Sequence, residues 1–207
     1  MLKEFDRQLN NLVQKCYPEA ARMTVEQFLK YVEPLKRKIS EFVVPEVDLE
    51  KGQLPFVIVI TNNLVATEKA MSLVEREGNM GFIRMYPVET DSFKPIGGVN
   101  IPNQMAYLLL DIDRGKDTTN IAPNDALKII QKRKRSPLTI DKGIAILTQY
   151  PDFLKKNNCF SLLGSRRCDK RVSALWIGDG RPRLGWCWAG TPHTWLGSAS
   201  CDSRVGF

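Results

Sequence analysis

The C-terminal stretch GWCWAGTPHTWLGSASC, residues 185–201, gathers residue types that carry chemistry. It contains three of the four tryptophans, the one histidine and two of the five cysteines of the chain. A cysteine attacks as its thiolate, and a histidine can take the thiol proton. Cys187 or Cys201 with His193 is therefore the candidate catalytic set of a cysteine-dependent hydrolase or acyltransferase.

The same three residues are the candidate ligands of a metal ion. Structural zinc sites commonly pair two cysteines two to four residues apart. Here five residues separate Cys187 from His193, and seven separate His193 from Cys201. Because neither gap is short, the sequence predicts no metal and no other cofactor. A zinc-stabilised C-terminal module on Cys187, His193 and Cys201 stays open as an alternative, beside the simpler reading of the cysteines as small buried hydrophobic residues.

The tryptophans and arginines of this region suggest binding rather than catalysis. Trp186 and Trp188 are two residues apart and would share one face of a strand, with Cys187 on the other face. Indole rings supply stacking surface and guanidinium groups supply positive charge, which suits a flat or anionic ligand. The candidate ligand-binding residues are Trp186, Trp188, Trp195, Arg166, Arg167, Arg181 and Arg183.

These observations favour a binding protein whose Trp/Arg/His surface accepts a small anionic or aromatic ligand, or a protein partner. The alternative that the same indole rings fill a core stays open, since large aromatic side chains supply much of any core. Cysteine-dependent catalysis is the second hypothesis and the zinc module the third.

The composition narrows the class of partner only slightly. The chain has 207 residues, a formal net charge of +7 and a pI near 9.2. Positive charge attracts anions without selecting one, and no nucleic-acid-binding motif is present, so nucleic acid ranks below a small ligand. No apolar run approaches the roughly 18 residues of a membrane span. The N-terminus lacks a signal-peptide core, and five irregularly spaced cysteines suit a reducing compartment. We therefore expect a soluble cytoplasmic protein without a membrane partner.

The elements that must position these residues begin with a helical pair in residues 1–40. Apolar residues recur at three- and four-residue steps from Leu2 to Cys16 and again from Val25 to Val32. Thr24 and Gln27 have the spacing of a capping box, which starts a helix. Pro34 predicts a break in the second helix.

The middle of the chain, residues 55–150, mixes strands and helices. PFVIVI (55–60) and AYLLLDID (106–113) are continuous apolar runs that predict strands covered on both faces. A short strand is predicted at 81–86, and helices at 67–77 (closed by Gly78), 123–131 and 139–149 (capped by Thr139). Residues 87–104 contain three prolines and Gly97–Gly98, which predict a loop. A loop of that length is usually functional or mobile.

The C-terminal region, residues 159–201, reads as antiparallel β-structure. Short apolar stretches at 159–163, 172–177 and 184–189 are separated by Gly, Asp and Arg clusters, a pattern typical of a hairpin or meander. The sequence as a whole predicts a single α+β domain over residues 1–207. In that domain the N-terminal helical pair packs on a mixed sheet, and the C-terminal hairpin or meander carries the functional surface.

Three segments carry a resemblance to a known family. They are RPRLGWCWAGTPHTWLGSASC, SPLTIDKGIAILTQYP and NCFSLLGSRRCDKRVSALWI. Together they resemble a family of bacterial proteins of unknown function, with LGWCWAG-x-PHTWLGSASC as its C-terminal signature, over almost the whole chain. The resemblance implies a single bacterial cytoplasmic domain. It implies no activity, cofactor or catalytic residue.

Overall fold

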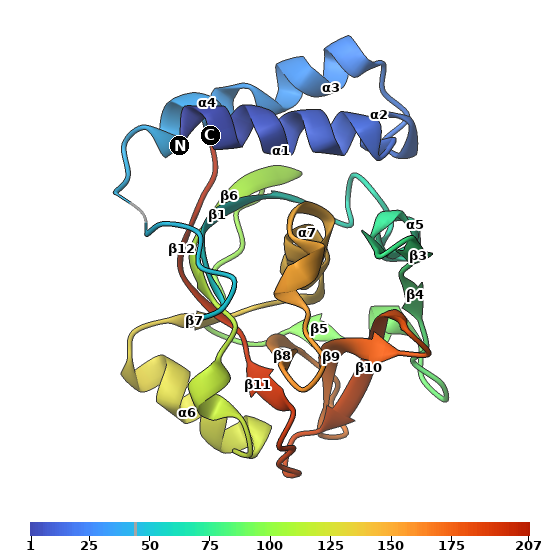
Figure 1. The fold of residues 1–207 in the computed structure, drawn as a ribbon, viewed down its shortest axis with the longest axis vertical. Helices are drawn as coiled ribbons and strands as arrows, with labels where there is room; N and C mark the ends of the chain where they lie inside the picture. Colours follow the sequence, from blue (N-terminus) through green and yellow to red (C-terminus); the bar gives the residue numbers. More distant parts are fainter. Residues whose placement is uncertain (44) are drawn as a thin grey trace.

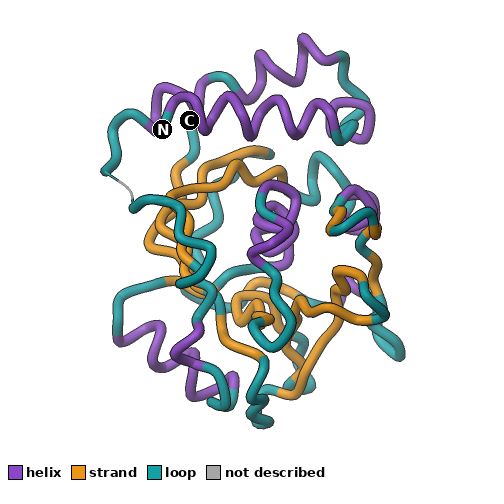
Figure 2. Tube along the Cα trace, viewed as in Figure 1, coloured by secondary structure: helices purple, strands orange, loops and turns teal. Residues whose placement is uncertain are grey.

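The computed structural model describes residues 1–43 and 45–207. Two β-sheets lie on either side of helix α7 (Ile140–Gln149), and the N-terminal helices cover the outer face of the first sheet (Figures 1 and 2). The predicted α+β class is confirmed. No helix among the described residues is long and apolar enough to cross a membrane.

The N-terminal segment forms two helical arms that run side by side (Figure 1). The first arm contains α1 (Leu2–Gln14) and α2 (Tyr17–Ala20), and the second contains α3 (Val25–Val32) and α4 (Pro34–Ile39). The predicted capping box is present, because Thr24 Oγ1 accepts from the Gln27 N–H at 3.2 Å and Gln27 Oε1 accepts from the Thr24 N–H at 2.9 Å. Pro34 begins α4, which confirms the predicted break.

The first sheet has four strands in the order β1 (Gln53–Ile60), β6 (Ala106–Asp113), β12 (Ser200–Val205) and β7 (Ser136–Pro137), with antiparallel neighbours. Both predicted buried strands are confirmed as β1 and β6. The side chain of Gln8 joins α1 to β1: its amide group donates to Phe56 O at 3.0 Å and accepts from the Ile58 N–H at 2.9 Å. One face of the sheet is thereby fixed to the N-terminal helices.

The second sheet contains the predicted C-terminal meander. Strands β8 (Cys159–Arg166), β9 (Arg171–Gly178) and β10 (Arg181–Trp188) pair antiparallel in sequence order. Three shorter strands extend this sheet: β11 (Leu196–Ser198) pairs parallel with β8, β4 (Phe82–Ile83) pairs parallel with β10, and β5 (Lys94–Pro95) pairs antiparallel with β8. The prediction that 159–201 forms one meander misses β12, which leaves this sheet and lies between β6 and β7 of the first.

Helix α5 (Thr67–Leu73) is shorter than predicted. Val74 is extended, and Glu75–Arg76 form strand β2, which pairs with β3 (Asn79–Met80). Gly78 lies in the turn of this hairpin at φ +77°, a left-handed conformation that a side chain disfavours, so it does not close a helix. The predicted strand at 81–86 is reduced to Phe82–Ile83.

Helix α7 is a core helix rather than a surface helix. Nine of its ten residues are buried, and Gly143 packs directly against the side chains of Leu162 and Leu175 in the second sheet. The helix begins after Thr139, as predicted, but the Thr139 side chain forms no cap bond. Helix α6 (Pro123–Lys132) confirms the helix predicted at 123–131. Among the described residues, three short 3-10 helices lie at Thr90–Ser92, Lys116–Thr118 and Pro151–Phe153.

Candidate functional site

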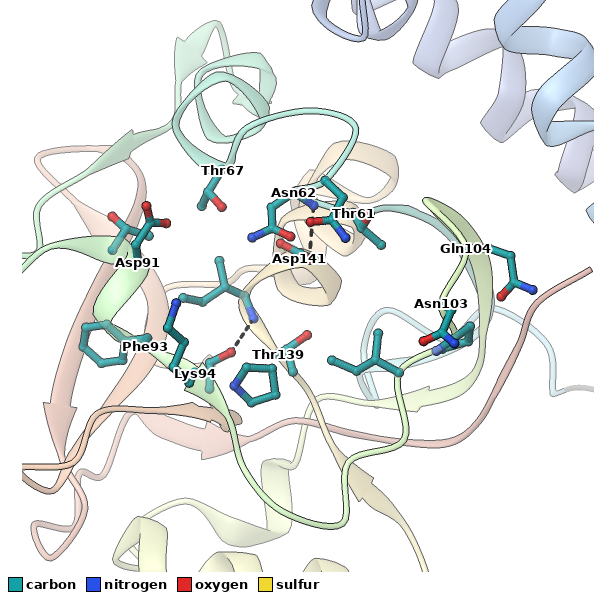
Figure 3. A pocket seen from close by; sticks show the side chains of 17 residues that line it. Thr61, Asn62, Thr67, Asp91, Phe93, Lys94, Asn103, Gln104, Thr139 and Asp141 are labelled. Atoms are coloured by element: carbon teal, nitrogen blue, oxygen red, sulfur yellow. Dashed lines mark hydrogen bonds between the residues drawn. The ribbon is translucent and has the colours of Figure 1, made fainter.

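A pocket of about 360 Å³ lies where α7 begins and β1 ends; we call it the α7 pocket (Figure 3). Its lining comes from five separate segments: the residues after β1, the start of α5, the loop 90–104, the start of α7, and Ser165 of β8. The volume is at the lower end of the roughly 300–1,000 Å³ typical of small-molecule sites. The fold therefore forms a cavity large enough for one small ligand.

Five buried hydroxyl side chains line this pocket. Thr61, Thr67, Thr90, Thr139 and Ser165 are each between 3% and 7% exposed. Thr61 Oγ1 is fully buried and has no hydrogen-bond partner among the described residues. A buried polar atom without a partner costs about 1–3 kcal/mol. The free protein thus carries an unfavourable polar group in the wall of the α7 pocket.

Two of these hydroxyl groups already accept hydrogen bonds from the start of α7. Ser165 Oγ accepts from the Ile140 N–H at 3.1 Å, and Thr139 Oγ1 accepts from Lys142 Nζ at 3.2 Å. A hydroxyl that accepts one bond keeps its own hydrogen free to donate. Thr139 and Ser165 can therefore act as donors toward a molecule in the pocket.

Few charged groups face the α7 pocket. Asp141 Oδ2 accepts from the Asn62 N–H at 3.3 Å, and burial raises the pKa of the Asp141 carboxyl group. Asp91 and Lys94 are exposed and lie opposite Asp141 across the pocket (Figure 3). The lining thus contains two carboxyl groups and one ammonium group, so the net positive charge of the chain is not concentrated here.

None of the described residues that line this pocket is a cysteine or a histidine. Its side chains are hydroxyl, amide, carboxyl and apolar groups, which hydrogen-bond and shape a ligand. The arrangement is suited to binding.

The predicted Trp/Arg/His surface is divided between two groups of side chains. In the first group, the rings of Trp186 and Trp188 pack at 5.2 Å between centroids, and the Arg171 guanidinium lies 4.4 and 4.9 Å from them. Trp188 is 44% exposed, whereas Cys187 between them is 8% exposed. These exposures agree with the expected alternation along the strand.

The second group lies on the other face of the sheet. Trp176 and Trp195 are 6.3 Å apart, the Arg183 guanidinium lies 4.7 Å from the Trp176 ring, and His193 packs on Trp195 at 5.3 Å. Gly185 lies against Trp176, since a Cβ there would be 2.2 Å from the indole. Gly185 and Trp186 are neighbours in a strand and point to opposite faces. The structure therefore does not bring all the tryptophans together.

Trp176 and Trp195 line an open recess of about 550 Å³, with Lys156 and Asn157 at its edge; we call it the indole recess.

The other candidate arginines contact different partners within the chain. Arg181 lies 4.5 Å from the ring of Phe82, and Arg166 donates to Asn124 Oδ1 at 2.8 Å. Arg167 pairs with Asp169.

The candidate catalytic residues lie on different elements. Cys187 is buried in β10, Cys201 is buried in β12 of the other sheet, and His193 is in the connection between β10 and β11. Burial raises the pKa of Cys187 to about 12 and also raises that of Cys201. A raised pKa disfavours the thiolate that cysteine catalysis requires. Cysteine-dependent catalysis stays a prediction, which thiol reactivity can test.

Metal ligands are not gathered at these positions either. The residues that the structure describes include no group of three or more His, Cys, Asp or Glu side chains able to hold a metal ion. Cys187, His193 and Cys201 therefore do not form such a group, and the zinc alternative gains no support.

One comparison with known proteins places the chain in a family. A model of a family of unknown function, DUF5701, matches residues 11–207. The chain belongs to DUF5701. This match confirms the resemblance to a family of unknown function. For the DUF5701 chain, comparison with curated proteins and with solved structures gave no match.

The sequence did not identify the α7 pocket, although two signals point toward it. The loop 87–104 is longer than a simple connection needs. Residues 90–91, 93–95 and 101–104 of this loop line the pocket. Thr61, Asn62 and Asn63 directly follow the apolar run of β1, where polar side chains reach the end of a buried strand. Thr139 was predicted only as a helix cap.

Proposed function

We propose that this DUF5701 chain is a binding protein that holds a small polar molecule in the α7 pocket. The observation that carries the proposal is the buried Thr61 hydroxyl, which has no partner among the described residues. Tyr107 has a similar buried hydroxyl group, but only Thr61 lies in the lining of the pocket. The cost at Thr61 is about 1–3 kcal/mol, and valine would avoid it with nearly the same shape. A ligand that hydrogen-bonds Thr61 Oγ1 would offset it.

The surroundings of Thr61 support the same proposal. Thr139 and Ser165 each keep a hydrogen free to donate, and the carboxyl group of Asp141 offers an acceptor beside them. These groups are held by core elements, namely α7 and β8. A rigid scaffold that presents several hydrogen-bonding groups to one cavity limits the conformational entropy lost on binding.

Thermal-shift screening with and without the Thr61 hydroxyl tests this proposal. A panel of small polar molecules (sugars, amino acids, nucleosides and short carboxylic acids) is screened against the wild type, Thr61→Val and Tyr107→Phe. Tyr107→Phe is the matched control, because it also removes a buried hydroxyl that lacks a described partner, but away from the pocket lining. We expect a compound that stabilises the wild type and the control but stabilises Thr61→Val less, with affinity lowered about tenfold by loss of one hydrogen bond.

Two outcomes contradict the proposal. One is that every stabilising compound acts equally on Thr61→Val, which places binding elsewhere. The other is that no compound of the panel raises the midpoint of the wild type.

A second candidate function is binding of an aromatic anion at the indole recess. Its supporting observation is the arrangement of Trp176 and Trp195, which meet at 63° and flank an open cavity, with the positive charge of Lys156 at its edge. Such an arrangement can stack a flat ring and attract its negative group. Of the predicted Trp/Arg/His surface, this candidate keeps Trp195 in the lining of the recess. Arg183 and His193 pack on the rings of Trp176 and Trp195.

Tryptophan fluorescence tests the second candidate with adenosine monophosphate and salicylate as probes. We expect quenching that Trp176→Phe reduces, that Trp186→Phe leaves unchanged, and that salt weakens. Equal quenching in both variants would exclude the indole recess as the site.

A further inference from the structure

The chemistry of the α7 pocket allows the ligand class to be narrowed, on the premise that the proposed function is right. We infer that the pocket takes an uncharged molecule with several hydroxyl groups, a sugar or a polyol.

The first argument is the two-way hydrogen-bonding capacity of the lining. Each hydroxyl group of the five buried Ser and Thr residues can both donate and accept. The side-chain amides of Asn62, Asn63, Asn103 and Gln104 also offer donors and acceptors. A ligand hydroxyl group is itself a donor and an acceptor. A ligand with several of them can satisfy this lining more completely than one with acceptors alone.

The second argument is the charge of the lining. Sites for phosphate and carboxylate usually contain arginine, whose guanidinium pairs with two oxygens at once. The described lining of the α7 pocket contains no arginine, and its one lysine, Lys94, is exposed at the rim. Asp91 and Asp141 would repel an anion. An anionic ligand, one of the classes that the sequence suggested for the Trp/Arg/His surface, is therefore disfavoured at this site.

A cationic ligand is disfavoured as well. Lys94 and the carboxyl groups of Asp91 and Asp141 bring charges of both signs to the lining. Asp141 also lies in the first turn of α7, whose N-terminal end carries a partial positive charge. Neither sign of charge dominates the interior of the pocket.

The third argument is the combination of carboxyl and apolar groups. A carboxylate has two oxygens that can accept from two hydroxyl groups of one ligand. Phe93, Ile101 and Pro102 supply apolar surface in the same lining, and Phe93 is only 5% exposed. Sugars and cyclic polyols present hydroxyl groups at their edges and C–H groups on their faces. The polar groups of the lining can thus bind the hydroxyl edges of such a ligand, and its apolar groups can pack on the C–H faces.

Matched pairs of neutral and phosphorylated ligands test the inference by isothermal titration calorimetry. The probes are glucose with glucose 6-phosphate, ribose with ribose 5-phosphate, and inositol with inositol monophosphate. We expect at least one neutral member to bind about tenfold or more tightly than its phosphate, with little dependence on salt. Thr61→Val should weaken binding of the neutral ligand. Asp141→Asn should reduce the difference in affinity between the neutral ligand and its phosphate. Asp125 is an exposed carboxylate on α6, so Asp125→Asn should leave both the affinity for the neutral ligand and the affinity for its phosphate unchanged.

The possible failures are distinguishable. A phosphate that binds as tightly as its neutral partner overturns the inference. If no sugar or polyol binds but another compound shows the Thr61-dependent thermal shift, the inference on ligand class is overturned and the proposed function stands. If no compound shows that dependence, both are overturned.

Discussion

Lys142 Nζ donates a hydrogen bond to Thr139 Oγ1 across 3.2 Å, so the first turn of α7 links a buried ammonium group to the lining of the α7 pocket. Lys142 is fully buried, and its Nζ lies 5.9 Å from the centre of the Tyr107 ring. Desolvation by burial, together with the nearby charge of Arg204, lowers the pKa of Lys142 to about 7.

This lowered pKa predicts a pH-dependent effect of Lys142→Met on stability. An unfolded lysine titrates near 10.4, so between about pH 7 and pH 10.4 the unfolded chain holds a proton that the folded chain has released. The free energy of unfolding of the wild type therefore rises with pH across this window, and the cost of the buried ammonium is fully present below it. We expect Lys142→Met to stabilise the protein most below pH 7, by about a few kcal/mol, and the gain to fade toward pH 10.

Urea unfolding at several pH values measures this effect. Lys128→Met, at an exposed lysine of α6, should show no comparable trend. A gain from Lys142→Met that is constant with pH, or that grows as pH rises, would show that Lys142 is charged in the folded protein throughout the window.

A pair of threonine substitutions tests the energetic basis of the proposed site in the free protein. Thr118 Oγ1 donates to Gly115 O at 2.7 Å and accepts from the Ser198 N–H at 2.8 Å, whereas Thr61 Oγ1 has no described partner. Thr118→Val should therefore lower the free energy of unfolding by about 1–3 kcal/mol, and Thr61→Val should leave it unchanged or raise it. Equal losses in the two variants, measured by urea unfolding, would mean that the Thr61 hydroxyl stabilises the fold itself.

The packing of α7 between the sheets predicts the effect of Gly143→Ala. Alanine normally favours a helix over glycine by about 1 kcal/mol. A Cβ at Gly143, however, would lie 2.7 Å from side-chain carbons of both Leu162 and Leu175. We expect overpacking to dominate and to destabilise the protein by about 1–3 kcal/mol. Gly190→Ala, where a Cβ meets nothing within 4 Å, is the control in the same unfolding assay. Stabilisation by Gly143→Ala would show that the sheets separate easily around α7.

Thiol titration tests the hypothesis of cysteine catalysis. Cys16 and Cys168 are exposed, whereas Cys159, Cys187 and Cys201 are buried with raised pKa values. In native protein, Ellman's reagent should react rapidly with the two exposed thiols only, and with all five after denaturation. Fast reaction of Cys187 or Cys201 in the native protein, identified by mass spectrometry, would restore the hydrolase or acyltransferase hypothesis.

The sequence predicted well those helices and strands that are determined by the pattern of residues close together in the chain. The apolar runs of β1 and β6, the capping box at Thr24 and the meander of β8 to β10 each depend on neighbouring residues, and each is confirmed. The exchange of β12 into the first sheet depends instead on pairing with β6 and β7, which are far away in the sequence.

The α7 pocket could not be predicted in the same way. Thr61, Thr90, Thr139 and Ser165 are ordinary residues of four separate segments, and only the tertiary structure buries them around one cavity. Tryptophan and arginine attract attention in a sequence because of their size and charge. Strand alternation places Trp176 and Trp186 on opposite faces of the second sheet. The predicted Trp/Arg/His surface is therefore divided between these two faces.

Amide chemical shifts during titration with a compound from the screen test the central claim most directly. The two-dimensional ¹H–¹⁵N spectrum reports binding residue by residue and separates the α7 pocket from the indole recess. We predict that the largest changes occur at residues 61–63, at 90–94 and at 139–141, and that Thr61→Val requires about tenfold more ligand to produce them. Changes centred on Trp176 and Trp195, with residues 61–63 and 139–141 unaffected, would contradict the proposal that the α7 pocket is the binding site.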